Sequence, residues 1–280
     1  MLQSTIKKTF SLSSVGVHSN AMTQLIARPA EINTGIVFVC KGKKIHASYD
    51  NVTETLMSTK ISNQNGDYVT TIEHLSAALY ALNITNIVIE LDSNEMPIMD
   101  GSAKVFIDAI LNAEICEQNA CVDFIKILKP VTVSIDNKHV LLTPADSFIL
   151  DVECDFSAKG LHTVREVFEF GKNNFITNIA PARTFGFIDE VEYIRSQGLA
   201  QGASFDNTLV FDNRGNPINE NGLRIPNEPV RHKLLDAIGD LSLANGKILG
   251  KYDAYCPGHK LNNLLLRKLF SDKSNYEIYQ

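Results

Sequence analysis

The chain has 280 residues, of which 44% are hydrophobic and 21% charged, proportions that are typical of a globular protein and exclude a disordered or fibrous one. Its formal net charge of −6 argues against nucleic acid as a partner, because nucleic-acid-binding domains are usually basic. The five cysteines include no CxxC pair, which is unlike a disulfide framework or a thiolate zinc site and favours a reducing, cytoplasmic compartment.

The first third of the chain is expected to be rich in β-strands. Short runs of β-branched and aromatic residues at Thr9–Val17, Thr23–Ala27 and Gly35–Cys40 are separated by turn residues. The spacing of His18, in a turn, implies no chemistry, so we expect a structural role or a place on the surface. The N-terminus has no apolar targeting segment and no run approaches the length of a membrane span, so we expect no stable membrane insertion.

The segment Val69–Leu82 is predicted to be a helix, because its leucines and alanines recur at helical spacing on one face. Glu73 and His74 lie near its expected start. Thr70 and Glu73 have the spacing of a capping box, so Glu73 could serve only to close the helix, and His74 could be a satisfied buried histidine. The pattern alone does not separate these structural roles from a chemical one.

A strand at Asn86–Leu91 and a helix at Ala103–Leu111, with Ser102 as its N-cap, complete the first half. The polar stretch Asn112–Ala120 follows, and it is the best candidate for a linker. We therefore expect two domains, at residues 1–120 and 121–280. The order of strands and helices favours an α+β fold of two similar halves, each a sheet covered by helices, over alternating βαβ units.

The second half repeats this plan. Its predicted strands are Phe124–Leu128, Val131–Ile135, His139–Thr143, Phe148–Cys154 and Val164–Phe170. The segment Phe185–Asn213 holds a short amphipathic helix followed by a strand-like stretch, and we expect a strand–helix–strand insert there. A final helix is expected at Asn262–Phe270.

The most informative stretch is VRHKLLDAIGDL, Val230–Leu241. Its apolar residues fall on one side of a helix, and Pro229 suits the first turn. His232, Asp236 and Asp240 are spaced four apart, so they form a stripe on another side. A His/Asp pair at this spacing can hold one metal ion, although a solvated polar face is the commoner reason for such a stripe. A metal site needs a third ligand from elsewhere.

His74 is a candidate for that ligand, which would complete a set of two histidines and one aspartate. Three protein ligands leave a fourth position open, as in catalytic rather than structural zinc sites. Glu73, next to His74, could then accept a proton from water. His259, expected in a loop after Gly258, could protonate a leaving amine with Asp240 behind it. With seven histidines in the chain, spacing alone leaves this arrangement open.

The chain closely resembles the UDP-3-O-acyl-N-acetylglucosamine deacetylase family. The resemblance is carried by TIEHL, PIMDGSA, ARTFGF, GASFDN, VRHKLLDAIGDL and PGHKLNN, in this order and at these separations along nearly the whole chain. Members of this family are zinc amidases that commit Gram-negative bacteria to lipid A synthesis. The resemblance implies two α+β domains, each a sheet layered with two helices, and an active site between them.

The resemblance also implies roles for individual residues. The residues that resemble the family's metal ligands are His74, His232 and Asp236. The ion that they would hold is Zn²⁺, with Fe²⁺ as the alternative. Those similar to the acid–base groups are Glu73 as general base and His259, backed by Asp240, as the charged partner of the leaving group and oxyanion. Those that resemble residues facing the substrate and its oxyanion are Lys233 and Thr184.

The rest of the substrate site is implied in the same way. Lys138, Asp155 and Phe156 resemble the part of the family that meets the uridine diphosphate. Phe185 begins the insert, which resembles the passage for the acyl chain. Before Gly258-His259, the chain has Cys256-Pro257 where many members have a basic residue and a serine. This departure bears on diphosphate contacts from that segment.

The expected reaction is hydrolysis of the N-acetyl group of a UDP-linked acylated amino sugar, which gives acetate and a free amine. We expect a monomer to carry it out. One alternative is a metal-free binding module for nucleotide sugars, which would not need Glu73 or His259 beside a metal triad. Another is a chain joined to an acyl-carrier-protein dehydratase, for which 280 residues leave no room.

Overall fold

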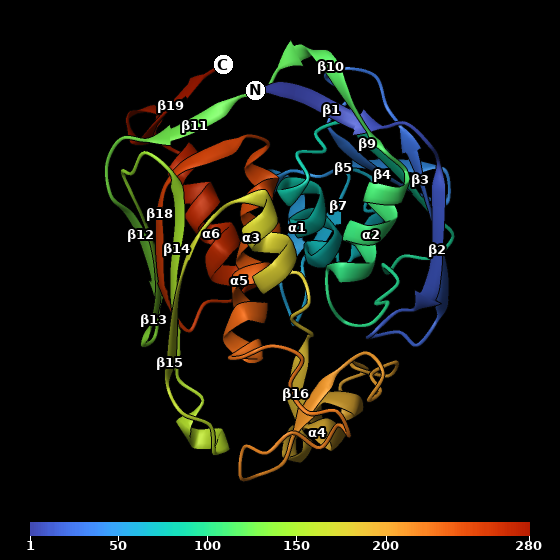
Figure 1. Cartoon of the computed structure of the whole chain (residues 1–280), viewed down its shortest axis with the longest axis vertical. Helices are drawn as coiled ribbons and strands as arrows, with labels where there is room; N and C mark the ends of the chain where they lie inside the picture. The colour runs from blue at the N-terminus through green and yellow to red at the C-terminus, as the bar shows by residue number, and fades with distance from the viewer.

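The computed structural model describes residues 1–280 and has an α+β fold, as predicted. Two sheets lie on the outside of the molecule, and most of the helices lie between them (Figure 1). In this view the sheet of the first half is on the right and that of the second half on the left. Both halves contribute to one hydrophobic core of 56 buried residues, so the layers form a continuous body.

The first half contains a five-stranded sheet with the order β2-β3-β9-β4-β5. Its strands are β2 (Phe10–Val15), β3 (Met22–Pro29), β4 (Ile36–Cys40), β5 (Lys43–His46) and β9 (Ile87–Leu91). A separate three-stranded sheet consists of β6 (Val52–Glu54), β7 (Lys60–Ser62) and β8 (Tyr68–Thr70). Helices α1 (Glu73–Ala81) and α2 (Lys104–Asn112) lie on the inner side of the larger sheet (Figure 1).

The second half contains a seven-stranded sheet centred on β18 (Lys247–Tyr255), a strand that the sequence did not indicate. Its other strands are β11 (Phe124–Ile127), β12 (Val131–Ile135), β13 (Lys138–Thr143), β14 (Phe148–Cys154), β15 (Val164–Glu169) and β19 (Tyr276–Tyr279). β18 pairs in parallel with β14 and antiparallel with β13. Outside the insert described below, the helices of this half are α3 (Lys172–Asn178), α5 (Glu228–Leu241) and α6 (His259–Phe270).

The polar stretch that was predicted as a linker is not a free connection. It contains β10 (Ile115–Cys121), which pairs antiparallel with β1 (Leu2–Ile6). None of the side chains of β10 is fully buried, so the strand lacks the apolar alternation that would have identified it. The pairing ties the N-terminus of the chain to the connection between its halves.

The two helix N-termini of the first half differ in detail from the prediction. The N-cap of α1 is Ile72, which makes no side-chain cap hydrogen bond. The backbone N–H of Thr70 donates to the backbone oxygen of Asn94, at 2.9 Å, so Glu73 does not close a capping box. α2 begins at Lys104, one residue later than expected, with Ala103 at the N-cap position, but the hydroxyl of Ser102 still accepts a hydrogen bond from the backbone N–H of Lys104 at 3.1 Å. The capping-box interpretation of Glu73 was therefore wrong.

His259 is the first residue of α6, so the prediction of a loop at this position was also wrong. Gly258 precedes the helix in an extended conformation. α6 begins with two polar residues, His259 and Lys260, and its buried leucines begin only at Leu261, so the apolar pattern indicated a later start. The helix start fixes the backbone of His259 more firmly than a loop would.

The predicted strand–helix–strand insert is present. It consists of β16 (Phe185–Phe187), α4 (Val191–Ser196) and β17 (Leu209–Phe211), with β16 and β17 paired in parallel. It projects from the lower end of the molecule (Figure 1) and has its own small cluster of buried side chains, Phe187, Leu209 and Phe211. None of the helices combines the length and the apolar composition that crossing a bilayer would require.

Helices α1 and α5, which belong to different halves, approach each other closely at Gly239. A Cβ atom at Gly239 would lie 2.1 Å from the backbone oxygen of Glu73, so only glycine permits this contact. The contact places the first turn of α1 against the last turn of α5. Residues that are far apart in the sequence are thereby brought to one point between the two sheets.

Candidate active site

The imidazoles of His74 and His232 and the carboxylate of Asp236 face one another where α1 meets α5. Their ligand atoms all lie within 4.8 Å of one another, and all three residues are buried. The Oδ1 atom of Asp236 is 3.4 Å from Nε2 of His232 and 3.7 Å from Nε2 of His74. Two imidazole nitrogens and one carboxylate oxygen form a donor set that suits zinc or iron(II).

Both imidazoles are in the neutral form that metal binding requires. Burial, followed by the neighbouring His232, lowers the pKa of His74 to about 3. Burial also lowers the pKa of His232, whose Nδ1 lies 3.1 Å from the backbone oxygen of Ala182. A proton on Nδ1 that is donated to this oxygen leaves the lone pair of Nε2 facing the cluster. The residues present therefore fit a bound divalent cation.

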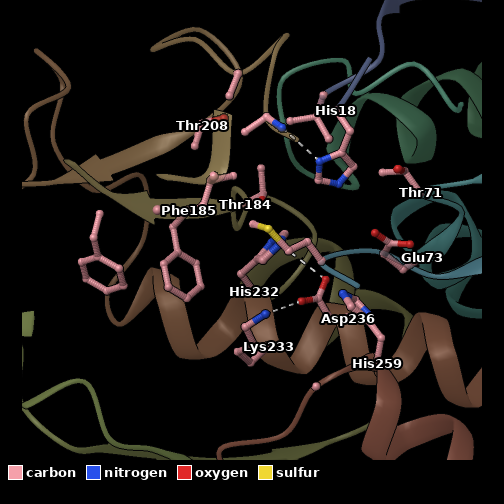
Figure 2. Close-up of a pocket in the computed structure, with 18 of the residues that line it drawn as sticks. His18, Thr71, Glu73, Thr184, Phe185, Thr208, His232, Lys233, Asp236 and His259 are labelled. Carbon is pink, nitrogen blue, oxygen red and sulfur yellow. Dashed lines mark hydrogen bonds and ion pairs between the residues drawn. The ribbon is translucent and has the colours of Figure 1, made fainter. Parts of the chain in front are cut away.

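Asp236 remains ionised in this buried position. Burial alone would raise its pKa, but neighbouring charged groups, Lys233 and His259 among them, outweigh burial and hold the pKa well below its usual range. The Nζ atom of Lys233 donates to Oδ2 of Asp236 at 2.9 Å, an interaction visible in Figure 2. This hydrogen bond occupies one carboxylate oxygen and leaves Oδ1 directed at the two imidazoles.

Glu73 is the first residue of α1 and only 3% exposed. Its Oε2 atom accepts a hydrogen bond from the backbone N–H of Thr59 at 3.0 Å. Burial raises the pKa of Glu73 to about 7, although the charge of His259 acts in the opposite direction. A cation held by the adjacent His74 would lower this pKa. A carboxylate poised in this range can accept a proton near neutral pH.

His259 is buried and paired with Asp240, whose Oδ2 atom lies 2.8 Å from its Nδ1. Burial disfavours the imidazolium, but the Asp240 carboxylate outweighs burial and raises the pKa of His259 to about 9. His259 is therefore protonated at neutral pH. The side chains of Glu73, Asp236 and His259 gather in one region of the cavity in Figure 2. One base and one acid thus lie beside the candidate ligand set.

A cavity of about 740 Å³ contains this region and extends to the insert. The predicted substrate-facing residues Thr184, Phe185 and Lys233 line it, as does the exposed Lys138. Thr184 is held between the halves by its backbone, because its N–H donates to the oxygen of Gly101 at 2.7 Å. The apolar lining near the insert comes from Ile188, Val191, Ile194, Phe205 and Val210.

Asp155 and Phe156 do not line the cavity directly. The Oδ1 atom of Asp155 accepts hydrogen bonds from the backbone N–H of Ser157 and the hydroxyl of Thr163. Phe156 packs edge-on against Phe185, with 5.5 Å between the ring centroids. The structure thus places these two residues behind the cavity wall, whereas Cys256 lines it and accepts a hydrogen bond from the N–H of Asp155.

His18 also lines this cavity, a position that its sequence context did not indicate. Its Nδ1 accepts a hydrogen bond from the N–H of Ala200 at 3.3 Å, and its buried Nε2 has no protein partner. Its ring points into the cavity (Figure 2). No spacing signal identifies it, because its position depends on a contact between the first half and the insert. A Cβ at Gly202 would lie 2.3 Å from the backbone oxygen of Gly16, which shows how tight that contact is.

The ion pair between Arg183 and Glu228 was also missed. Both side chains are buried, and the Nε atom of Arg183 donates to Oε1 of Glu228 at 2.8 Å. Glu228 also accepts hydrogen bonds from the backbone N–H groups of Arg183 and Arg224. Because Glu228 begins α5 and Arg183 precedes Thr184, this pair fixes the start of α5 against the segment that lines the cavity.

Known proteins match this chain along almost its whole length. The profile of a family described as UDP-3-O-acyl N-acetylglycosamine deacetylase matches residues 3–271. A UDP-3-O-acyl-N-acetylglucosamine deacetylase of Psychrobacter sp. (strain PRwf-1) is 43% identical, over 99% of this chain and 95% of that protein. Proteins of the same name from Histophilus somni (strain 129Pt) and Pasteurella multocida (strain Pm70) are 42% and 43% identical, each over 98% of this chain and 92% of its own length.

These matches include every residue of the candidate site. The profile covers both helices that carry the candidate ligands, the insert, and the start of α6 with His259. The resemblance that the sequence motifs indicated is therefore confirmed, and the chain belongs to the UDP-3-O-acyl N-acetylglycosamine deacetylase family.

Proposed function

We propose that the chain is a metal-dependent amide hydrolase that removes the N-acetyl group of UDP-3-O-acyl-N-acetylglucosamine, releasing acetate and a free amine in lipid A synthesis. Membership of the family supports the reaction. The main structural support for the site is that a buried cluster of two histidines and one aspartate lies in the same cavity as Glu73 and His259. A module that only binds nucleotide sugars would have no use for an acid and a base beside such a cluster.

The metal ion is held by His74, His232 and Asp236 in this proposal, and zinc is its first candidate. Iron(II) is the alternative, because the same donor set suits both ions. When bound, the ion polarises the scissile carbonyl and makes the attacking water more acidic. The neutral imidazoles and the ionised carboxylate support this assignment, since all three groups are in the protonation state of ligands.

Glu73 is the proposed general base, and His259 the proposed general acid. Glu73 accepts a proton from water, whose oxygen bonds to the acetyl carbon. When the carbon–nitrogen bond breaks, His259 donates its proton to the departing amine. Asp240 keeps His259 charged until that moment, as its 2.8 Å contact and the raised pKa of His259 support. The hydroxyl of Thr184 and the charges of Lys233 and His259 stabilise negative charge on the carbonyl oxygen.

The substrate lies along the cavity in this proposal. Its sugar sits beside the cluster, and its acyl chain runs between the apolar side chains of the insert, starting at Phe185. The uridine diphosphate extends toward Lys138, whose ammonium group can pair with phosphate. In this proposal Asp155 and Phe156 do not contact the substrate but orient two residues that line the cavity, Cys256 and Phe185.

The proposed domains are residues 1–120 and 121–280, with the site between them. This division is supported by the strand pairing. β10 pairs with β1 of the first half, and β11, which follows it in the sequence, pairs with β19 in the sheet of the second half. All the groups named come from one chain, so a monomer is sufficient for the reaction. We propose the cytoplasm as its location because all five cysteines are free thiols.

The direct test is turnover of UDP-3-O-acyl-N-acetylglucosamine by the purified chain before and after treatment with a chelator. We expect release of one free amine per turnover, loss of activity with the metal, and recovery on adding Zn²⁺ or Fe²⁺. Comparison of the two ions at equal occupancy decides which supports turnover. Unchanged activity in a sample shown to be free of metal would contradict the proposal.

A further inference from the structure

Thr59 lies between the proposed base, Glu73, and Asp240, the carboxylate behind the proposed acid, and it contacts both. It directly precedes β7 and is only 2% exposed. Its backbone N–H donates to Oε2 of Glu73 at 3.0 Å, and its hydroxyl donates to Oδ1 of Asp240 at 2.6 Å. Its backbone oxygen accepts a hydrogen bond from the N–H of Thr71 at 3.0 Å. All three polar groups of this one residue are therefore engaged.

The Asp240 carboxylate depends on Thr59 for one of its two oxygens. Oδ2 receives hydrogen bonds from His259 and from the amide of Asn262, both at 2.8 Å. Oδ1 receives only the hydroxyl of Thr59. Asn262 is itself fixed, because its amide oxygen accepts the hydroxyl proton of Tyr252 at 2.6 Å. Without the Thr59 hydroxyl, a buried carboxylate oxygen would be left unpaired and the carboxylate could turn about its χ2 angle.

Glu73 and His259 reach the site from different elements. Glu73 comes from the first turn of α1, Asp240 from α5 and His259 from the first turn of α6. Thr59 belongs to none of these helices and lies at the end of the loop between β6 and β7. Its two donors thus connect the carboxylate of the proposed base to the carboxylate behind the proposed acid.

We propose that Thr59 is a positioning residue that holds the Asp240–His259 pair in register with Glu73. The inference rests on the proposed function, because it assigns a purpose to the two groups that Thr59 links. Proton transfer by two separately mounted groups requires both to be placed within fractions of an ångström of the reacting atoms. A loss of this positioning acts on the chemical step, so it lowers kcat more than it raises KM.

The first test replaces the hydroxyl without changing the shape or the backbone donor. Thr59→Val removes the hydrogen bond to Asp240 but keeps the N–H that Glu73 accepts. We expect kcat to fall by about tenfold or more, the factor that accompanies loss of a hydrogen bond to a charged group, with little change in KM or metal content. Thr59→Ser keeps the hydroxyl, and we expect kcat close to wild type.

Ser58→Ala is the matched control. Ser58 is the adjacent buried residue, and its hydroxyl lies 3.0 Å from that of Thr70 and makes no hydrogen bond to Glu73 or Asp240. We expect its loss to lower thermal stability without lowering kcat. If Ser58→Ala and Thr59→Val reduced kcat equally, general loosening of this segment would explain both, and the positioning role of Thr59 would be rejected.

A double-variant comparison separates positioning of His259 from a structural effect. In a His259→Ala background, Thr59→Val has no acid left to misplace, so we expect no further fall in kcat. A further fall by the same factor as in the wild type would overturn the inference. If Thr59→Val does not fold, Thr59→Ala is used in the same cycle, with the same two outcomes.

The same measurements distinguish failure of this inference from failure of the proposed function. A His259→Ala chain that kept wild-type turnover would contradict the proposed acid and leave Thr59 without a group to position. A His259→Ala chain that lost turnover, together with a Thr59→Val chain that kept it, would uphold the proposed acid and overturn only the role of Thr59.

Discussion

The two ends of the active-site cavity are built on different physical principles. At the polar end, buried charged groups from α1, α5 and α6 are each held by specific hydrogen bonds, as Asp240 is by Thr59, His259 and Asn262. At the apolar end, the insert has a cluster of only three buried side chains. Its Ile188 and Tyr193 are 43% and 69% exposed. One end is fixed atom by atom, and the other supplies an apolar surface.

The difference follows from the cost of burying charge. A buried carboxylate without partners is strongly destabilising, so each one at the polar end must be paired, and any change there breaks a pair. An exposed aliphatic or aromatic side chain in the insert has no such requirement, and most surface substitutions change stability little. We therefore expect all-or-none effects near the cluster and graded effects along the insert.

The largest effect is expected from removing two of the proposed ligands. A chain carrying both His232→Ala and Asp236→Ala should lose its bound metal and reduce turnover by roughly three orders of magnitude or more, since the ion contributes several kcal/mol to the reaction. Its circular dichroism spectrum should stay close to that of the wild type. Metal analysis checks this directly, and metal content equal to that of the wild type would refute the ligand assignment.

A smaller but still sharp effect is expected at the contact between the two halves. In Gly239→Ala, the new Cβ would lie 2.1 Å from the backbone oxygen of Glu73, so α1 and α5 must separate. We expect the free energy of unfolding to fall by about 1–3 kcal/mol, together with a loss of turnover as Glu73 is displaced. Chemical denaturation and kinetic assays measure both.

Gly171→Ala is a suitable control for that substitution, because no atom lies closer than 4.0 Å to the added Cβ. It should leave turnover unchanged. If Gly239→Ala behaved in the same way as Gly171→Ala, the close approach of α1 and α5 would not control the site.

The pH dependence of kcat/KM should be bell-shaped, with tenfold changes per pH unit on its limbs. Glu73 acts in its ionised form, so activity falls as the pH drops below its pKa, which is about 7 and lower when a cation is bound beside it. His259 acts in its protonated form, so activity falls again as the pH rises through about 9. An alkaline limb that persisted unchanged in His259→Gln would show that another group causes it.

The smallest effect on activity is expected from changing the length of the acyl chain that lies along the insert. Each methylene group of the acyl chain that enters the apolar part of the cavity contributes about 0.8 kcal/mol, so kcat/KM should change by about fourfold per methylene until the passage is filled. A series of substrates that differ only in acyl length measures this slope. A flat response across the series would contradict the placement of the acyl chain in the insert.

Local sequence patterns predicted those features that are determined locally. The runs at β12 and β14 were bounded correctly, and the spacing on α5 placed His232 and Asp236 on one side of a helix. The central strand β18 escaped prediction because two of its buried positions are occupied by Gly250 and Ala254, which weaken the apolar alternation.

Features that depend on contacts between distant segments could not be predicted from these patterns. The third member of the ligand set, His74, meets the other two only because Gly239 lets α1 approach α5. Thr59 carries no motif, and its proposed role depends on contacts of a loop with α1 and α5. The family resemblance indicated the roles of the ligands and acid–base groups, but it did not reveal how their geometry is maintained.

The most direct test of the proposed mechanism is Glu73→Gln, with turnover, metal content and melting temperature measured on the same sample. Glutamine can still accept the hydrogen bond from the N–H of Thr59, but it cannot take a proton from water. We predict a melting temperature and metal content near those of the wild type, with turnover reduced by at least about a hundredfold. Turnover close to that of the wild type would contradict the claim and leave Glu73 with a structural role alone.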